Sequence, residues 1–301
     1  TLDMLEVYAD VIENLLAIPV LKGQKTKKEQ FAGADATYTV ETLMHDGRAL
    51  QGGTSHYFGQ NFTKAFDVKF QNRNGEQEYA YQTSWGISTR LIGAVIMAHG
   101  DNRGLKLPPY VAPIQVVIVP IAQEKGNVLE EAGKIQEKLK EKFRVELDDR
   151  DNYTVGYKFN DWEMKGVPVR IEIGPKEIEH GEVIVTRRDT LEKMPIKIDE
   201  LPEKMEELLK DIHNSMFNTC KKRMEEKTTV ALNMDEFVKN INENQGFVKT
   251  MWCGSQECED KIKELTGAPS RCIPFEQEHL ADTCVCCGKK ADKMVVWGRQ
   301  Y

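Results

Sequence analysis

The sequence contains no long apolar run. None of its hydrophobic stretches approaches the roughly eighteen residues that a membrane-spanning helix needs, and its first residues lack the charge, apolar stretch and small residues of a secretory signal. Of its 301 residues, 40% are hydrophobic and 30% are charged, as in ordinary soluble proteins of two or three domains. We therefore expect a cytoplasmic protein that has no membrane partner.

An excess of positive charge is also absent. The formal net charge is -7 at pH 7, which argues against indiscriminate binding of polyanions. Any nucleic acid must then be bound by local patches of basic side chains and not by the field of the whole molecule. A basic loop does occur, and by default it is a solvated surface segment. It contains Lys22, Lys25, Lys27 and Lys28.

A disulfide framework does not explain the cysteines, because their number, seven, is odd and four of them crowd near the carboxyl end. Cys253-x4-Cys258 and Cys284-x2-Cys287 instead form two chelating loops, which can offer four thiolates to one tetrahedral zinc ion. Such a closed site has a structural role. Cys286 is an alternative fourth ligand, but we favour Cys287 because Gly288 follows it and eases the tight turn. Free buried thiols are the remaining alternative.

Two separate segments, Gln51 to His56 and Ser84 to Arg90, together have the features of a ligand site. Gly52 and Gly53 lack the Cβ that would keep the backbone away from a bound molecule. Arg90 carries a permanent charge and a fixed fork of donors, which suit a polyphosphate. The alternative is an ordinary turn followed by a solvated arginine.

These segments resemble the active site of prolyl-tRNA synthetases, which are class II aminoacyl-tRNA synthetases, of the type found in archaea and eukaryotes. The resemblance continues to the final residue, so it covers the whole chain. Its most specific matches are Leu50–His56, Gly59–Phe62, Ser84–Gly86, Thr89–Ala94, His99–Asp101 and Leu107–Pro109.

The resemblance implies ATP-dependent attachment of L-proline to tRNA(Pro) through a prolyl-adenylate, with Mg²⁺ accompanying the ATP. Arg90, Gln51 and Thr54 are then the catalytic residues. The implied ATP-binding residues are Gln51, Thr54, Ser88 and Arg90, with Arg90 on the γ-phosphate, and the implied proline-binding residues are Gly53, His56, Ser84 and Trp85.

Two motifs that precede this site in class II enzymes are not found: one for dimerisation and one whose arginine contacts the α-phosphate. Residues 3–17 have helical apolar spacing from the outset, as if the sequence entered in mid-domain. We therefore expect a homodimer formed through the absent part, and no catalysis by this chain alone. A non-catalytic tRNA-binding or regulatory fragment is the main alternative, and a zinc-stabilised adaptor is another. Both leave the intact ATP and proline residues unexplained.

The expected fold class is multidomain, combining α/β and α+β parts. Residues 1–109 are expected to form part of an antiparallel-sheet class II catalytic domain, residues 110–200 an α/β anticodon-binding domain, and residues 201–301 a linker helix and a small α/β zinc-binding domain. Within the first part, Asn74-Gly75 predicts a hairpin with a two-residue turn. Beyond Pro109, strands are predicted at 114–121, 144–147, 167–173 and 183–188, and helices at 127–143, 205–226 and 234–244.

The resemblance also implies how tRNA, as opposed to DNA, is recognised. Four residues fall where the family reads the two guanines of the proline anticodon: Glu163, Arg170, Lys176 and Glu177. The chemistry is suitable, because carboxylates accept hydrogen bonds from the Watson–Crick edge of guanine, while Arg and Lys donate to its O6 and N7. Without the resemblance, the sequence predicts that Phe159 and Trp162 are core residues and that the charged residues near them lie on the surface.

Overall fold

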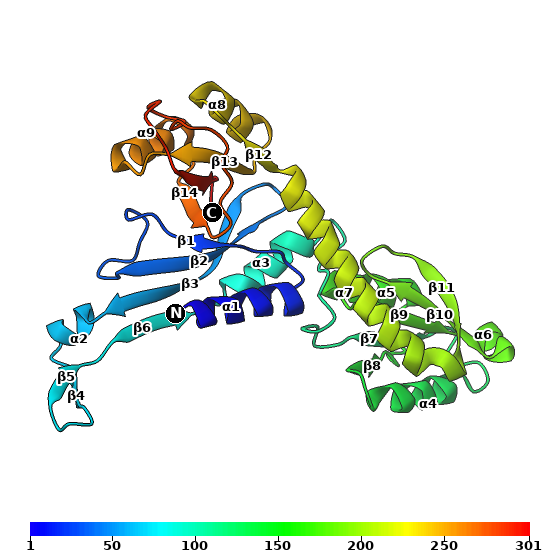
Figure 1. Ribbon diagram of the computed structural model, residues 1–301. Helices are drawn as coiled ribbons and strands as arrows, with labels where there is room; N and C mark the ends of the chain where they lie inside the picture. Colours follow the sequence, from blue (N-terminus) through cyan, green and yellow to red (C-terminus); the bar gives the residue numbers. More distant parts are fainter. The chain divides into compact units, whose positions relative to one another are not determined.

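The computed structural model describes all residues from 1 to 301, and the chain forms two compact units. The first unit contains Thr1–Asn14, Ile18–Ala94 and Lys221–Tyr301, and the second contains Leu15–Ala17 and Val95–Cys220. Figure 1 shows both units and labels most of their helices and strands. None of the helices combines the length and apolar character that crossing a membrane would require.

The first unit is built on one eight-stranded sheet. In spatial order its strands are β12 (Thr228–Val230), β13 (Phe247–Trp252), β15 (Lys293–Trp297), β14 (Ser270–Pro274), β1 (Leu21–Gln24), β2 (Ala36–Leu43), β3 (Ala49–Gly59) and β6 (Gln82–Gly86). All neighbours are antiparallel except β12 and β13. The sheet therefore joins strands from the first and last hundred residues.

The pairing of β1 with β14 makes this joint, and it depends on a glycine. Gly23 lies opposite Pro274, and a Cβ added to Gly23 would come within 2.4 Å of the carbonyl oxygen of Ile273. Because real Cβ atoms do not approach an oxygen so closely, any larger residue would push the two strands apart.

The first unit also contains α1 (Leu2–Asp10), α2 (Asn61–Ala65), α8 (Met234–Glu243), α9 (Gln256–Thr266) and the beginning of α3 (Arg90–His99). The helical spacing over residues 3–17 is confirmed as far as Leu15, although its second half is not α-helical. A π-helical turn, Val11–Leu15, follows α1 at once. Leu5 and Ile12 are fully buried, so the helical spacing of the apolar residues did identify the side of α1 that packs on β2 and β3.

The hairpin predicted around Asn74-Gly75 is confirmed, but its turn is wider than expected. Its strands are β4 (Lys69–Gln71) and β5 (Gln77–Tyr79), with Gln71 opposite Gln77, so residues 72–76 form the loop. The side-chain Oδ1 of Asn72 accepts hydrogen bonds from the backbone N–H groups of Asn74 and Glu76, both at 2.9 Å. An asparagine that caps its own loop thus replaces the two-residue turn. In Figure 1 this hairpin projects beyond the ends of β3 and β6.

The second unit has a five-stranded sheet in the order β11 (Lys193–Lys197), β10 (Glu182–Arg187), β9 (Val169–Ile173), β7 (Val116–Pro120) and β8 (Val145–Leu147). The last three strands are parallel to one another. Its helices are α4 (Val128–Lys140), α5 (Val155–Lys165), α6 (Pro175–His180) and most of α7 (Leu201–Glu226). The predicted α/β pattern is confirmed, although α5, α6 and β11 were not foreseen.

The alternation within β9 gives the two faces of this sheet different characters. Val169, Ile171 and Ile173 enter the main core with α4 and α7. Between them, Arg170 and Glu172 point to the opposite face, where Trp162 of α5 packs with valines of β7. A buried polar network therefore lies beneath α5.

Candidate functional site

The pairing of β3 with β6 decides which side chains can meet. His56 lies opposite Ser84, and Ser55 lies opposite Trp85. Because successive side chains of a strand point to opposite faces, Thr54, His56 and Ser84 share one face of the sheet. Trp85, which is 52% exposed, is on the other face with Ser55, whose hydroxyl donates to the Thr1 carbonyl oxygen at 2.8 Å. The structure thus does not bring Trp85 to the same face as His56.

The two glycines that open the site are required by packing. A Cβ on Gly53 would lie 3.1 Å from the ring of Tyr8, and one on Gly52 would lie 2.8 Å from the Cδ1 of Ile12. Tyr8 belongs to α1, and Ile12 to the π-helical turn that follows it. The absence of side chains at Gly52 and Gly53 therefore lets this segment lie close against β3.

His56 is held between two hydroxyls and two aromatic rings. Its Nδ1 is 3.0 Å from the Thr37 hydroxyl, and its Nε2 is 3.0 Å from the Thr54 hydroxyl. The rings of Phe31 and Phe58 have their centroids 4.9 Å and 5.9 Å from the imidazole. Burial lowers the pKa of His56 below its ordinary 6.5, so the ring is neutral at pH 7. One face of the sheet thus carries a small cluster of aromatic rings around an uncharged imidazole.

Phe31 is a residue of this aromatic cluster that the sequence did not reveal. It follows the lysine-rich loop and remains 51% exposed although it contacts His56. Its only signal in the sequence was its position at the start of the apolar segment 31–34. That signal is too short to distinguish a pocket wall from an ordinary surface residue.

Arg90 is the first residue of α3, and it faces the segment that carries Gln51. Its Nη1 donates to the Gln51 carbonyl oxygen at 3.3 Å, and its backbone N–H donates to the Ser88 hydroxyl at 3.3 Å. The first N–H groups of α3 are occupied, because those of Leu91 and Ile92 donate to the carbonyl oxygens of Ser88 and Thr89. The exposed guanidinium of Arg90, beside Gln51 and Ser88, is therefore the group at this place that suits an anion.

The lysine-rich loop is only in part the solvated segment that its charge suggested, because Lys27 is exposed but Lys25 is not. Lys25 is only 4% exposed, and its Nζ donates to Glu41 at 2.8 Å. Arg271 of β14 donates to the other oxygen of the same carboxylate at 2.9 and 2.6 Å. Burial by itself would raise the pKa of Glu41, but the two cations hold it below its usual value. This buried ion network connects β2 with β14.

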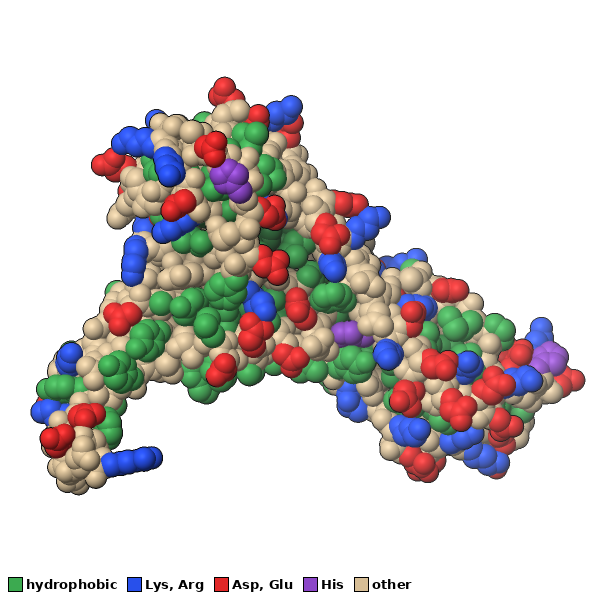
Figure 2. Space-filling view, in the orientation of Figure 1, with side chains coloured by type: hydrophobic (Ala, Val, Ile, Leu, Met, Phe, Trp, Pro, Cys, Tyr) green, Lys and Arg blue, Asp and Glu red, His purple; other side chains and the backbone are tan.

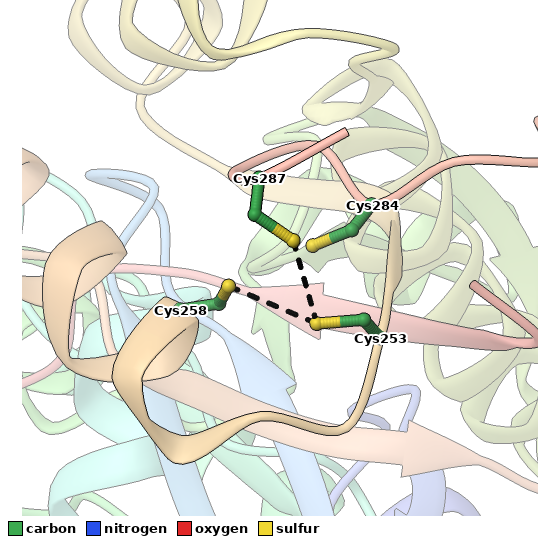
Figure 3. A group of neighbouring side chains, drawn as sticks. All are labelled: Cys253, Cys258, Cys284 and Cys287. Atoms are coloured by element: carbon green, nitrogen blue, oxygen red, sulfur yellow. Dashed lines mark hydrogen bonds between the residues drawn. The ribbon is translucent and has the colours of Figure 1, made fainter. Parts of the chain in front are cut away.

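Four cysteines converge at the end of β13. Cys253 follows that strand, Cys258 lies in the first turn of α9, and Cys284 and Cys287 come from one tight turn. Their thiols point toward one another (Figure 3), and the four sulfurs lie within 4.8 Å of each other. Cys253 Sγ is 3.7 Å from both Cys258 Sγ and Cys287 Sγ. The structure brings Cys287 and not Cys286 into this group, which could hold a metal ion.

In the second unit, Arg170 and Glu163 contact each other, but Arg170 is buried. Its Nη1 donates to Glu163 at 3.2 Å, while its Nε and Nη2 donate to Glu172 at 3.2 and 2.9 Å. Its guanidinium also lies over the ring of Phe159, 3.9 Å from the centroid. All three nitrogens are therefore engaged within the protein.

Lys176 and Glu177 lie elsewhere on this unit. Both belong to α6, which follows the carboxyl end of β9, whereas Arg170 is near the amino end of that strand. At about 3.3 Å per strand residue, Arg170 and Ile173 are already about 10 Å apart. The four residues predicted to read guanines therefore form two separate pairs, and Lys176 is exposed.

Comparison with known proteins agrees with these features. A family model described as "Anticodon binding domain" matches residues 115–208, and one described as "Prolyl-tRNA synthetase, C-terminal" matches residues 234–301. The chain is 57% identical over 301 residues to a proline–tRNA ligase of Clostridium botulinum. It is 58% identical to proline–tRNA ligase 2 of Bacillus cereus and 59% identical to proline–tRNA ligase 2 of Clostridioides difficile. Each comparison covers 100% of this chain and 63% of the relative.

The chain belongs to the prolyl-tRNA synthetase family. It spans about 63% of the length of the curated relatives that it matches. These three relatives are bacterial, so the similarity is not confined to archaea and eukaryotes.

The two segments matched by family models contain two of the groups described above. The sheet of the second unit, with Glu163 and Arg170, lies within the anticodon-binding match, and the four converging cysteines lie within the carboxyl-terminal match. The aromatic cluster around His56 lies outside both segments, but within the full-length similarity to proline–tRNA ligases.

Proposed function

We propose that the protein to which this chain belongs attaches L-proline to tRNA(Pro) in the cytoplasm, using ATP and passing through a prolyl-adenylate. The observation that carries this proposal is 57% identity to a proline–tRNA ligase along the entire chain. The geometry around His56 and Arg90 supports it, because an aromatic cluster and an anion site are on neighbouring strands and on the helix that follows them. A homodimer, which the resemblance also implies, stays a prediction that analytical ultracentrifugation would check.

Arg90, at the start of α3, would bind the polyphosphate of ATP. Adenylate formation is an in-line displacement at the α-phosphate, so orientation and neutralisation of charge supply most of the rate. The guanidinium is available for this role: it is exposed, and its Nη1 contacts only a carbonyl oxygen. Ser88, Gln51 and Thr54 would position the nucleotide, and the Mg²⁺ that accompanies ATP would share the neutralisation.

The pocket of His56, Ser84, Phe31 and Phe58 would hold proline. Aromatic walls suit an apolar five-membered ring. A protonated imidazole would repel the ammonium group of proline, and the lowered pKa of His56 prevents this at neutral pH. The Thr54 hydroxyl, which contacts the neutral ring, can accept a hydrogen bond from that ammonium group.

The four converging cysteines would hold a structural zinc ion. Zn–S bonds of about 2.3 Å at the corners of a tetrahedron separate the sulfurs by about 3.8 Å. The two sulfur–sulfur distances of 3.7 Å agree with this value. Bound zinc would fix the tight turn at 284–288 to the start of α9 and leave no open position for catalysis.

The second unit would read the anticodon through Glu163, Lys176 and Glu177, with Arg170 holding Glu163 from beneath. Figure 2 shows that acidic and basic side chains are interspersed over the visible face of this unit. Without a continuous basic field, recognition would depend on individual contacts to bases and not on general attraction to phosphates.

Proline-dependent exchange of pyrophosphate into ATP tests the proposal. The measurement uses the protein expressed at the full length of its relatives. Replacement of Arg90 with alanine should reduce exchange by about 10² to 10³, which is typical for loss of one electrostatic contact to a transition state. Arg73→Ala, at the tip of the hairpin, removes the same charge and should leave exchange unchanged. No exchange at all would instead favour a non-catalytic tRNA-binding or regulatory role, and exchange that does not depend on L-proline would contradict proline as the substrate.

A further inference from the structure

A turn just after α3 places an arginine directly beside Glu163. Nη1 of Arg103 donates to Oε2 of Glu163 at 3.1 Å, while buried Arg170 donates to Oε1 at 3.2 Å. The Arg103 side chain is 58% exposed, compared with 8% for Arg170. We propose that Arg103 and Glu163 together form the base-reading edge for one anticodon guanine. This inference rests on the proposed reading of the anticodon by the second unit.

The position of Arg103 is fixed by its neighbours. Asp101 accepts hydrogen bonds from the backbone N–H of Arg103 at 2.8 Å and from two nitrogens of buried Arg188 at 3.0 and 2.7 Å. These contacts, with Arg188 contributing most, hold the pKa of Asp101 well below its usual range. The carboxylate is therefore charged at any pH of interest, and the turn remains tied to β10.

The segment after the turn is fixed against the end of α5. Leu105 N–H donates to the Met164 carbonyl oxygen at 3.0 Å, and Leu107 N–H donates to that of Gly166 at 3.1 Å. Gly104 has a φ of +128°, and a Cβ there would lie 2.5 Å from the Met164 Cα. Only glycine fits this approach. Arg103 and Glu163 therefore meet as parts of a rigid arrangement and not through a chance surface contact.

The chemistry of this pair matches guanine and disfavours adenine. Guanine presents one acceptor, O6, next to two donors, N1–H and N2–H, on its Watson–Crick edge. The carboxylate of Glu163 supplies acceptors, and the adjacent guanidinium of Arg103 supplies a donor. This is the same order of groups that cytosine uses. Adenine has an acceptor at N1, which would face the carboxylate and be repelled.

Arg103 is better placed than Arg170 to donate to the base itself. All three nitrogens of Arg170 already donate to Glu163 and Glu172. For Arg103 the one side-chain contact is through Nη1, and most of the side chain remains in solvent. A guanidinium has five N–H donors, so Arg103 can keep Glu163 oriented and still donate to O6. In this arrangement Arg170 supports the carboxylate, and Arg103 touches the nucleotide.

Binding of RNA hairpins to the 301-residue chain tests this assignment. The probes are 17-nucleotide anticodon stem-loops of about the size of a natural arm, labelled with a fluorophore and measured by anisotropy at one fixed salt concentration. One carries guanine at the middle and third anticodon positions, and two others carry adenine at one of these positions. The variants are Arg103→Ala, Arg103→Lys and Glu163→Gln. Lys134→Ala is the matched control, because Lys134 is 60% exposed and also paired with glutamates.

Arg103→Ala should lower the preference for guanine at one of the two positions by about tenfold and leave the preference at the other unchanged. Glu163→Gln should relax the same position. Adding Arg103→Ala to Glu163→Gln should cost little more, because the two residues act as one unit. Arg103→Lys keeps the charge but loses the fork, so it should retain only part of the preference.

Three results would overturn the inference. If Arg103→Ala weakens all three RNAs equally, the guanidinium contacts only phosphate. If its affinities equal those of Lys134→Ala, Arg103 makes no contact with RNA. If the unaltered chain itself shows no preference for guanine at either position, the proposed reading of the anticodon fails and this inference fails with it. The first two outcomes leave that proposed function intact, so the two failures can be told apart.

Discussion

At the scale of single residues, the structure divides the predicted site residues into two groups. Some have side chains that a ligand can reach, and the others are buried and position the first group. His56 shares its face with Ser84, while Trp85 lies on the opposite face. Arg170 is buried with Glu172 and supports Glu163, whose side chain is 15% exposed. Sequence alone identifies such residues but not their direction, because direction depends on strand register and burial.

His56 should titrate below its ordinary pKa of 6.5, because burial disfavours the charged ring. As the pH falls, the unfolded chain takes up this proton before the folded chain does. His56 thus reduces stability only below about pH 6.5 and has no effect above it. An NMR titration of the imidazole resonances, assigned with His56→Gln, would measure the midpoint. A midpoint at or above 6.5 would contradict the neutral pocket that we propose for proline.

Arg170→Ala should destabilise the second unit as well as weaken RNA binding. It leaves the buried carboxylate of Glu172 with only Lys193 and Thr186, at a cost of about 2 to 3 kcal/mol. Lys193→Ala is the control, because this exposed lysine contacts the same carboxylate. It should cost less than about 1 kcal/mol. Hydrogen exchange of β9 and β10 in increasing urea would compare the two. Equal losses of unfolding free energy in the two variants would mean that burial of Arg170 contributes nothing to stability.

At the scale of elements, patterns with a clear period were predicted well, and local exceptions were not. The alternating and buried apolar runs identified β7, β9 and β10, and helical spacing identified α4, α7 and α8. The short helix α6 was missed because its six residues, Pro175–His180, are too few to establish a period. The hairpin loop widened because Asn72 caps it, a contact that no two-residue turn pattern contains.

The turn that carries Cys284, Cys286 and Cys287 allows us to predict which of its cysteines bind the metal. About one equivalent of zinc should copurify with the chain, and Cys287→Ser should lose it, because Cys287 belongs to the converging group. Cys286→Ser, one residue away, should keep it. Metal analysis of the two purified variants decides between them. Loss of zinc in Cys286→Ser but not in Cys287→Ser would restore the alternative ligand set, and absence of zinc from both and from the parent would remove the site altogether.

At the scale of the whole molecule, the feature that sequence could not anticipate is the continuous sheet of the first unit. The choice of β14 as the neighbour of β1 joins residues about 250 positions apart in the chain, and no local pattern encodes such a partner. The ion network of Lys25, Glu41 and Arg271 crosses the same joint and is almost fully buried. Lys25, one of the lysines that were expected to form a solvated loop, is therefore part of the core between two segments.

Because this sheet is continuous, we predict that removal of the metal also destabilises strands outside the cysteine turns. The metal group lies at the end of β13, and β13 is connected through β15 and β14 to β1 and β2. If the sheet is one cooperative unit, chelation should raise amide hydrogen exchange in β1 and β2 as well as in α9. The strands β7, β9 and β10 belong to the other sheet and should keep their protection. Hydrogen-exchange mass spectrometry before and after chelation gives both measurements on one sample, with Cys286→Ser as a variant that should behave like the parent. Exchange that rises only at residues 253–258 and 284–288 would show that the metal stabilises its own turns and that the joint between β1 and β14 holds without it.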